Sequence, residues 1–286
     1  MSEALGLDFF ASLDGDLAYR DTGGSGVPVV LLHAGFLDHT MWDEQVPPLA
    51  QAFRVIAPDA RGHGWSANAN RPFRQTDDLA ALLRHLEAHP AVLVGISMGA
   101  AIAVATALEH PALVRALVIT GGGTDEGAFT EPWSRQAQAA QFQALAAGDI
   151  EGWHEAGDLW AHGPERARDA VPPQTYARLR EMRRRTISKH SPGEPDHRVV
   201  VADLTARAGR IAVPVLALNG AQDAPELRNM AEYVARAAPL GRTAVIDGAA
   251  HFPNLDRPES YTRIVADFVH GLPPWDPSAQ EPVGRL

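Results

Sequence analysis

Short, continuous apolar runs recur along the chain and are separated by amphipathic segments. The runs that predict strands cover residues 27–34, 53–60, 91–97, 115–120, 213–220 and 242–251. Runs of this length are typical of strands buried on both faces of a parallel sheet. Helical periodicity occupies gaps at 74–89, 98–110 and 225–239. This alternation predicts an α/β fold with a mostly parallel central sheet flanked by helices.

The pattern changes at the start of the chain and again in its middle. Apolar and polar residues alternate over 9–21 around Asp14-Gly15, which predicts a β-hairpin. Between about 121 and 210 the helix-like pieces contain no convincing strand, and this stretch is too long for a loop. We therefore predict an inserted helical cap. The predicted domains are 1–122 (N-terminal part of the core), 123–210 (cap) and 211–286 (C-terminal part of the core, with an extended tail from about 271).

Composition narrows the range of partners. The chain has 25 Lys+Arg against 35 Asp+Glu, and its formal charge of -10 argues against nucleic acid and anionic membranes. It contains no cysteine, which excludes disulfides, thiolate metal sites and a cysteine nucleophile. The first residues lack the pattern of a signal peptide, and every apolar run is too short to span a membrane. We expect a cytoplasmic protein, monomeric or homodimeric, that acts on a small molecule.

The pentapeptide Gly95-Ile96-Ser97-Met98-Gly99 lies where a predicted strand gives way to a predicted helix. It matches G-x-S-x-G, in which a strained turn exposes a serine nucleophile between small neighbours. The Met98 N–H would then point, with the helix dipole, at the charge that develops on a substrate oxygen. The alternative is that glycine and serine only form a strand-to-helix turn.

A serine nucleophile needs a base, and the base needs an acid that orients it. His251 follows the last predicted strand in a loop of small residues, so it is our candidate base. Asp223 follows the preceding strand and gives the order Ser, Asp, His. Asp223 is alternatively an N-cap of the helix near Pro225. Asp125, after an earlier strand, is the rival acid.

These linked motifs resemble the α/β-hydrolase superfamily, in its serine hydrolase branch with a helical cap. The segment His33-Ala34-Gly35-Phe36 looks like the family's His-Gly-x-x oxyanion loop, with alanine where the first glycine is usual. The resemblance implies that Phe36 or Gly35 donates the second N–H of an oxyanion hole beside Met98. Residues 59–66 resemble the family's D-x-R-G-x-G-x-S segment, for which we expect a structural role, His63 included.

Two features of the predicted cap bear on the substrate. Aromatic residues are candidates for an apolar substrate pocket, although packing of cap helices onto the core explains such residues as well. The pocket candidates from the whole chain are His33, Trp133, Phe142, Trp153, Trp160 and Phe252, and Phe129 belongs to the same aromatic group. The basic run 178–190 is interpreted as a solvated helix face, or as the source of an arginine for a substrate carboxylate.

The sequence thus predicts a serine hydrolase that needs no metal or organic cofactor. The resemblance favours a carboxylesterase or lactonase that acts on a small, largely apolar molecule through an acyl-enzyme on Ser97. A carbon–carbon bond hydrolase acting on a diketone is the first alternative. The second is a non-hydrolytic protein of the same fold: a small-molecule receptor, a cofactor-free oxygenase or a biosynthetic cyclase.

Overall fold

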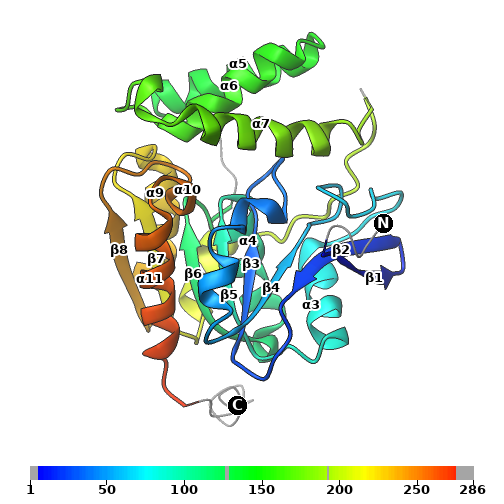
Figure 1. Ribbon diagram of the computed structural model, residues 1–286, viewed down its shortest axis with the longest axis vertical. Helices are drawn as coiled ribbons and strands as arrows, with labels where there is room; N and C mark the ends of the chain where they lie inside the picture. The colour runs from blue at the N-terminus through cyan, green and yellow to red at the C-terminus, as the bar shows by residue number, and fades with distance from the viewer. Residues whose placement is uncertain (1–5, 126–128, 192, 275–286) are drawn as a thin grey trace.

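An eight-stranded sheet forms the centre of the computed structural model, which describes residues 6–125, 129–191 and 193–274 (Figure 1). The strand order is β1-β2-β4-β3-β5-β6-β7-β8. Strands β1 and β2 form the predicted hairpin, β2 pairs antiparallel with β4, and all later pairs are parallel. The strands are β1 (Asp8–Ser12), β2 (Gly15–Asp21), β3 (Pro28–Leu32), β4 (Arg54–Pro58), β5 (Ala91–Ile96), β6 (Val114–Thr120), β7 (Val215–Gly220) and β8 (Gly241–Ile246).

Both faces of the sheet are buried because successive side chains point to opposite sides. In β3, Val29 and Leu31 join one hydrophobic cluster, whereas Val30 and Leu32 join the other. The second cluster contains the apolar faces of α3 (Gln75–His85), α4 (Met98–Glu109) and α9 (Pro225–Ala237). The first is covered by η1 (His39–Trp42), α2 (Val46–Leu49) and α11 (Pro258–His270). The predicted α/β sandwich is therefore confirmed.

The six predicted strands and three predicted helices all occur, with boundaries shifted by a few residues. The prediction omitted α10 (Pro253–Asp256) and α11. In α11, Tyr261, Val265, Phe268 and Val269 lie one or two turns apart and are buried against the sheet. That spacing was a helical signal in a segment close to the predicted tail. Most of the tail lies outside the described residues.

Three cap helices form a layer above one end of the strands of the sheet (Figure 1). They are α5 (Pro132–Ala146), α6 (Ile150–His162) and α7 (Pro173–Ile187), and we call them the cap helices. The remaining short helices of the described chain are η2 (Pro111–Leu113) in the core, and η3 (Arg168–Ala170), α8 (Leu204–Arg207) and η4 (Ala208–Arg210) after the second cap helix. Within the described part of 123–210, one isolated bridge at Arg198 is the only β pairing, as expected for a helical insertion. The domain boundaries themselves stay a prediction.

None of the helices in the described ranges combines the length and apolarity needed to cross a membrane.

Candidate active site

Ser97 lies on the turn between β5 and α4, in a conformation that few non-glycine residues adopt. Its φ is 55° and its ψ is -114°. The Ser97 N–H donates to the Thr120 carbonyl (2.8 Å), which ties the turn to the end of β6. The residue is partly exposed although its neighbours in β5 are buried. Strain of this kind persists only where the surroundings impose it, and it is concentrated at functional sites.

Close packing explains both glycines of the pentapeptide. A Cβ added to Gly95 would lie 2.3 Å from the carbonyl carbon and oxygen of Gly99. A Cβ added to Gly99 would lie 2.1 Å from the carbonyl oxygen of Leu32, at the end of β3. The first turn of α4 therefore packs directly on β3 and β5, and this contact sets the position of Ser97.

His251 and Asp223 form a buried hydrogen-bonded pair at the ends of β8 and β7. His251 Nδ1 lies 2.9 Å from Asp223 Oδ2, and both residues are at least 96% buried. Because the carboxylate accepts at Nδ1, the proton is held there and Nε2 carries the free lone pair. No hydrogen bond to Nε2 occurs among the described residues. Asp223 Oδ1 accepts from the Ala224 N–H, and Ala224 rather than Asp223 is the N-cap of α9.

The Gly121-Gly122 dipeptide after β6 connects the pair with the serine. A Cβ on Gly121, whose φ is +56°, would lie 2.7 Å from His251 Cε1 and 3.1 Å from Asp223 Oδ2. A Cβ on Gly122 would lie 2.6 Å from the Ser97 carbonyl oxygen. Ser97 and His251 are thus neighbours of one glycine dipeptide, and only residues without side chains fit between them.

The rival acid, Asp125, has a different partner. Its two carboxylate oxygens accept the N–H groups of Leu204 and Thr205, both at 2.9 Å, at the start of α8. Burial opposes ionisation of Asp125, but these hydrogen bonds outweigh it and lower its pKa. Asp125 therefore caps a helix, whereas Asp223 contacts the imidazole.

The candidate oxyanion loop is a tight turn from Ala34 to Leu37. The Leu37 N–H donates to the Ala34 carbonyl (3.1 Å), and Phe36 has a φ of 62°. A positive φ at the third position of such a turn usually requires glycine, so Phe36 is strained as Ser97 is. Gly35 lies against Met98, with 3.9 Å between an added Cβ and Met98 Cβ. The N–H groups of Phe36 and Met98 have no acceptor among the described residues.

His33, a pocket candidate, has both ring nitrogens bonded to backbone. Its Nδ1 lies 2.8 Å from the Ala34 carbonyl and therefore donates, while Nε2 accepts the Ala60 N–H at 2.9 Å. Burial lowers the pKa of His33, which keeps this neutral form. The structure thus uses His33 to join the oxyanion loop to the loop after β4.

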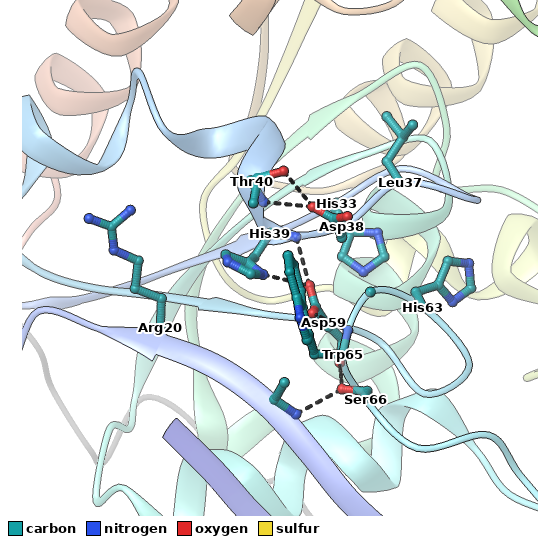
Figure 2. Close-up of polar contacts among 12 residues, drawn as sticks. Arg20, His33, Leu37, Asp38, His39, Thr40, Asp59, His63, Trp65 and Ser66 are labelled. Carbon is teal, nitrogen blue, oxygen red and sulfur yellow. Dashed lines mark hydrogen bonds and ion pairs between the residues drawn. The ribbon is translucent and has the colours of Figure 1, made fainter. Parts of the chain in front are cut away.

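The loop 59–66 forms the polar network beneath the oxyanion loop (Figure 2). Asp59 accepts from the His39 ring (2.9 Å) and from the N–H groups of His39 (2.7 Å) and Trp65 (2.8 Å). Burial opposes ionisation of Asp59, but these hydrogen bonds prevail and lower its pKa. Asp38, His39 and Asp59 lie close enough to hold a metal ion, yet their carboxylates already bond to protein donors. This matches a structural role.

Arg61 and His63 in the same loop also form hydrogen bonds within the protein. Arg61 pairs with Asp78 through two hydrogen bonds of 2.8 Å. His63 Nδ1 lies 3.1 Å from the Arg61 carbonyl, and burial lowers the pKa of His63 to about 3. A histidine with that pKa stays neutral near pH 7.

Aromatic residues of the cap lie at both ends of the candidate site. Trp160 lies 6.3 Å from the His251 ring and contacts Trp133 (5.2 Å) and Phe129 (5.6 Å). Phe252, which belongs to the core and directly follows His251, has its ring 5.0 Å from the His251 ring. At the oxyanion loop, Trp153 contacts the Phe36 ring edge-on at 5.2 Å. Phe142 is 63% exposed on α5, so the structure does not bring it to this group.

The basic run of α7 corrects our interpretation of a solvated face. Arg183 is 3% exposed and bonds to Asp158 (2.8 Å), which also binds Arg180 (2.7 Å) and Arg168 (3.2 Å). Arg185 binds Asp38, and Arg178 binds Glu44 at 2.9 Å. Charge alone suggested a solvated surface because the buried acidic partners of Arg180, Arg183 and Arg185 lie 22, 25 and 147 residues away in the sequence.

The family model for the alpha/beta hydrolase fold matches residues 27–258. This chain is an α/β hydrolase. It is 28% identical over 267 residues to a pimeloyl-[acyl-carrier protein] methyl ester esterase from Neisseria meningitidis serogroup C, covering 85% of this chain and 94% of that protein. It is 26% identical over 268 residues to 3-oxoadipate enol-lactonase 1 from Acinetobacter baylyi, covering 90% and 94%.

A solved structure described as "Est816 as an N-Acyl homoserine lactone degrading enzyme" superimposes with a TM-score of 0.74. Its sequence identity to this α/β hydrolase is 26%, over 91% of this chain and all of that one.

Sequence reasoning overlooked two polar residues of this α/β hydrolase whose side chains are covered and support the site. Asn219 in β7 accepts the Gly121 N–H (3.0 Å) and thereby holds the glycine dipeptide. Asp256 in α10 accepts the Ala250 N–H (2.8 Å) beside His251 and pairs with Arg166, which precedes α7 (2.8 Å). The Asn219–Gly121 and Asp256–Arg166 contacts join residues 98 and 90 positions apart, so no local pattern indicates either pair.

Proposed function

We propose that this α/β hydrolase cleaves a carboxylic ester or lactone of a small, largely apolar molecule through an acyl-enzyme on Ser97. Its similarity to a named esterase and a named enol-lactonase supports hydrolysis of that bond type. The observation that carries the proposal is the buried 2.9 Å contact between His251 Nδ1 and Asp223 beside the strained Ser97 turn.

The mechanism follows from where the protons lie. Asp223 holds the proton on His251 Nδ1, so Nε2 accepts the Ser97 hydroxyl proton as Oγ attacks the acyl carbonyl. The carbonyl oxygen becomes an oxyanion, for which Met98 and Phe36 offer unbonded N–H groups at the N-terminus of α4 and in the strained turn. Phe36 is preferred to Gly35 because the turn places its backbone strain there.

Collapse of this intermediate expels the alcohol, which takes the proton from His251 Nε2. Water then loses a proton to His251 Nε2 and attacks the acyl-enzyme, and the intermediate collapses to the acid as Ser97 Oγ leaves and takes that proton back from His251. The aromatic side chains at His251 and Phe36 favour an apolar substrate. A carboxylate-bearing substrate is disfavoured because Arg178, Arg180, Arg183 and Arg185 already pair with acids of the protein.

A fluorophosphonate probe tests the proposed nucleophile. We expect it to label the wild type once, at Ser97, and to leave Ser97→Ala unlabelled. Ser97→Ala should lose at least about 10⁴-fold in turnover of p-nitrophenyl esters while keeping its circular dichroism spectrum. Ser188→Ala, at an exposed serine after α7, is the matched control and should behave as the wild type. Unchanged hydrolysis by Ser97→Ala would refute the assignment.

Substrate choice is tested with a panel of p-nitrophenyl esters of increasing acyl length, lactones and a diketone. Trp160→Leu should raise the KM of aryl esters about fivefold, since an aromatic contact contributes about 1 kcal/mol. Phe142→Leu is its control, because that ring is exposed. Turnover of the diketone alone would favour carbon–carbon bond hydrolysis, and binding without turnover of any member would favour a non-hydrolytic protein.

A further inference from the structure

The oxyanion loop is held in place by a residue of the cap. Asp38 comes two residues after Phe36 and is completely buried. One carboxylate oxygen accepts from the Thr40 N–H (3.0 Å) and the Thr40 hydroxyl (2.6 Å), as Figure 2 shows. The other oxygen binds the Arg185 guanidinium, from the last turns of α7. The buried charge of Asp38 thus has its cationic partner in the cap.

The end of α7 makes further contacts with the oxyanion loop and with the loop 59–66. The Arg185 guanidinium stacks on the Trp65 ring at 4.1 Å, and the Trp65 N–H donates to Asp59. Thr186 accepts the Gly64 N–H (3.2 Å), and its hydroxyl lies 3.5 Å from the Leu37 carbonyl. The cap therefore supports the strained turn at Phe36 from the side that carries Asp38.

We propose that Arg185 is a positioning residue for the oxyanion hole, acting through Asp38 on the backbone of Phe36. The proposal rests on the proposed hydrolase function. A non-glycine residue with positive φ keeps that conformation only while its surroundings impose it. Without Arg185, the Asp38 carboxylate is buried without a counter-ion, which lowers stability, and the segment that follows Phe36 also loses the side-chain contact that ties it to α7. The Phe36 N–H then loses its alignment with the oxyanion.

Arg178 offers a matched control on the same helix. It lies two turns before Arg185 and is about equally exposed, 25% against 23% for the two side chains. Arg178 binds the Thr40 carbonyl and the half-exposed Glu44, so it contacts η1 rather than the oxyanion loop. Removal of a pair this exposed costs little.

The experiment measures kcat per fluorophosphonate-labelled site, KM, and inhibition by an aryl boronic acid, which forms a tetrahedral adduct. In Arg185→Ala we expect kcat and boronate affinity to fall together by about tenfold or more, with KM changed less than threefold, since an aligned oxyanion donor acts on the transition state. Arg178→Ala should change each quantity less than twofold. Arg185→Lys keeps the positive charge but lacks the planar guanidinium that stacks on Trp65, so its kcat and boronate affinity should lie between those of the wild type and Arg185→Ala.

The double variant Arg185→Ala/Asp38→Asn distinguishes two effects of losing Arg185: the lost contact between α7 and the loop, and the unpaired buried charge of Asp38. It also allows the test if Arg185→Ala alone fails to fold. We expect it to recover thermal stability but not kcat. Recovery of kcat in the double variant would overturn the proposal, as would equal kcat per labelled site in Arg185→Ala and Arg178→Ala. Absence of labelling and turnover in the wild type would instead refute the hydrolase assignment.

Discussion

The loops around Ser97 and the cap helices are held together by different forces. In the core, backbone approaches backbone so closely that Gly95 and Gly99 leave no room for a Cβ. In the cap, guanidinium groups bridge the elements: Arg183 joins α7 to Asp158 in α6, and Arg185 joins it to Asp38 in the core. Arg166 adds a third bridge to Asp256.

The difference teaches that the two regions tolerate change differently. Close packing of backbone transmits even one added methyl group to the catalytic geometry. Ion pairs depend instead on whether a buried charge keeps a partner. Substitutions in the core should therefore disturb chemistry and folding at once, whereas substitutions in the cap should divide into those that reach the site and those that do not.

The largest effect is expected at the acid of the candidate triad. Asp223→Asn should lower kcat about 10⁴-fold, because an amide no longer imposes the tautomer that leaves Nε2 free. Asp125→Asn tests the rival acid, whose carboxylate caps α8. The measurement is kcat with circular dichroism of both variants. A greater loss of kcat in Asp125→Asn would contradict the pairing seen here.

Gly99→Ala tests the packing of the core. Its Cβ would overlap the Leu32 carbonyl at 2.1 Å, so we expect a loss of at least about 3 kcal/mol in the free energy of unfolding. Gly209→Ala is the control, because its Cβ would lie 3.6 Å from the Ala237 carbonyl. Urea denaturation measures the free energy of unfolding of both variants. Equal values would show that the first turn of α4 does not pack closely on β3.

Arg183→Ala tests the cap. Asp158 keeps Arg180 and Arg168 but loses its buried partner, so we expect a loss of about 2 to 3 kcal/mol. Hydrogen exchange should locate faster exchange in α6 and α7 and leave β5 protected. Arg236→Ala, in an exposed pair with Glu232, should be neutral. Uniform loss of protection across the sheet would mean that cap and core unfold as one unit.

The smallest effect concerns pH. His63 has a pKa of about 3 in the folded protein against 6.5 ordinarily, so between these values the unfolded chain binds the extra proton. Stability therefore falls as pH decreases from 6.5, by at most about 1.4 kcal/mol per pH unit. In His63→Asn, the loss between pH 7 and 5 in urea midpoints should shrink by about 1 to 2 kcal/mol. An unchanged pH dependence would remove His63 as its source.

An element of the fold could be predicted where its signal lies in neighbouring residues of the sequence. Runs such as residues 91–96 predict buried strands because they contain no polar side chain. The helix α11 was not among the predicted elements, although its buried residues Tyr261, Val265 and Phe268 follow a helical spacing. Asp14-Gly15 predicted its hairpin, and Gly15, the first residue of β2, has a φ of +86°, which favours glycine.

The candidate site divides in the same way. The pentapeptide around Ser97 is local, and its strain and glycine packing are visible in the structure. The preference for Asp223 over Asp125 depended on its position in a turn directly after a strand, and the structure shows a different partner for each. The buried partners of Arg183 and Arg185, Asp158 and Asp38, had no local signal, although Glu181 lies one turn before Arg185.

The sequence by itself determined the α/β sheet, the strand-to-helix turn of Ser97 and the helical nature of the cap, because each depends on neighbouring residues. Only the tertiary structure decided which carboxylate faces His251, that Phe142 points outward, and that Arg185 reaches Asp38. The physical reason is that buried charges and hydrogen bonds are satisfied by partners far along the chain, and folding alone brings those partners together.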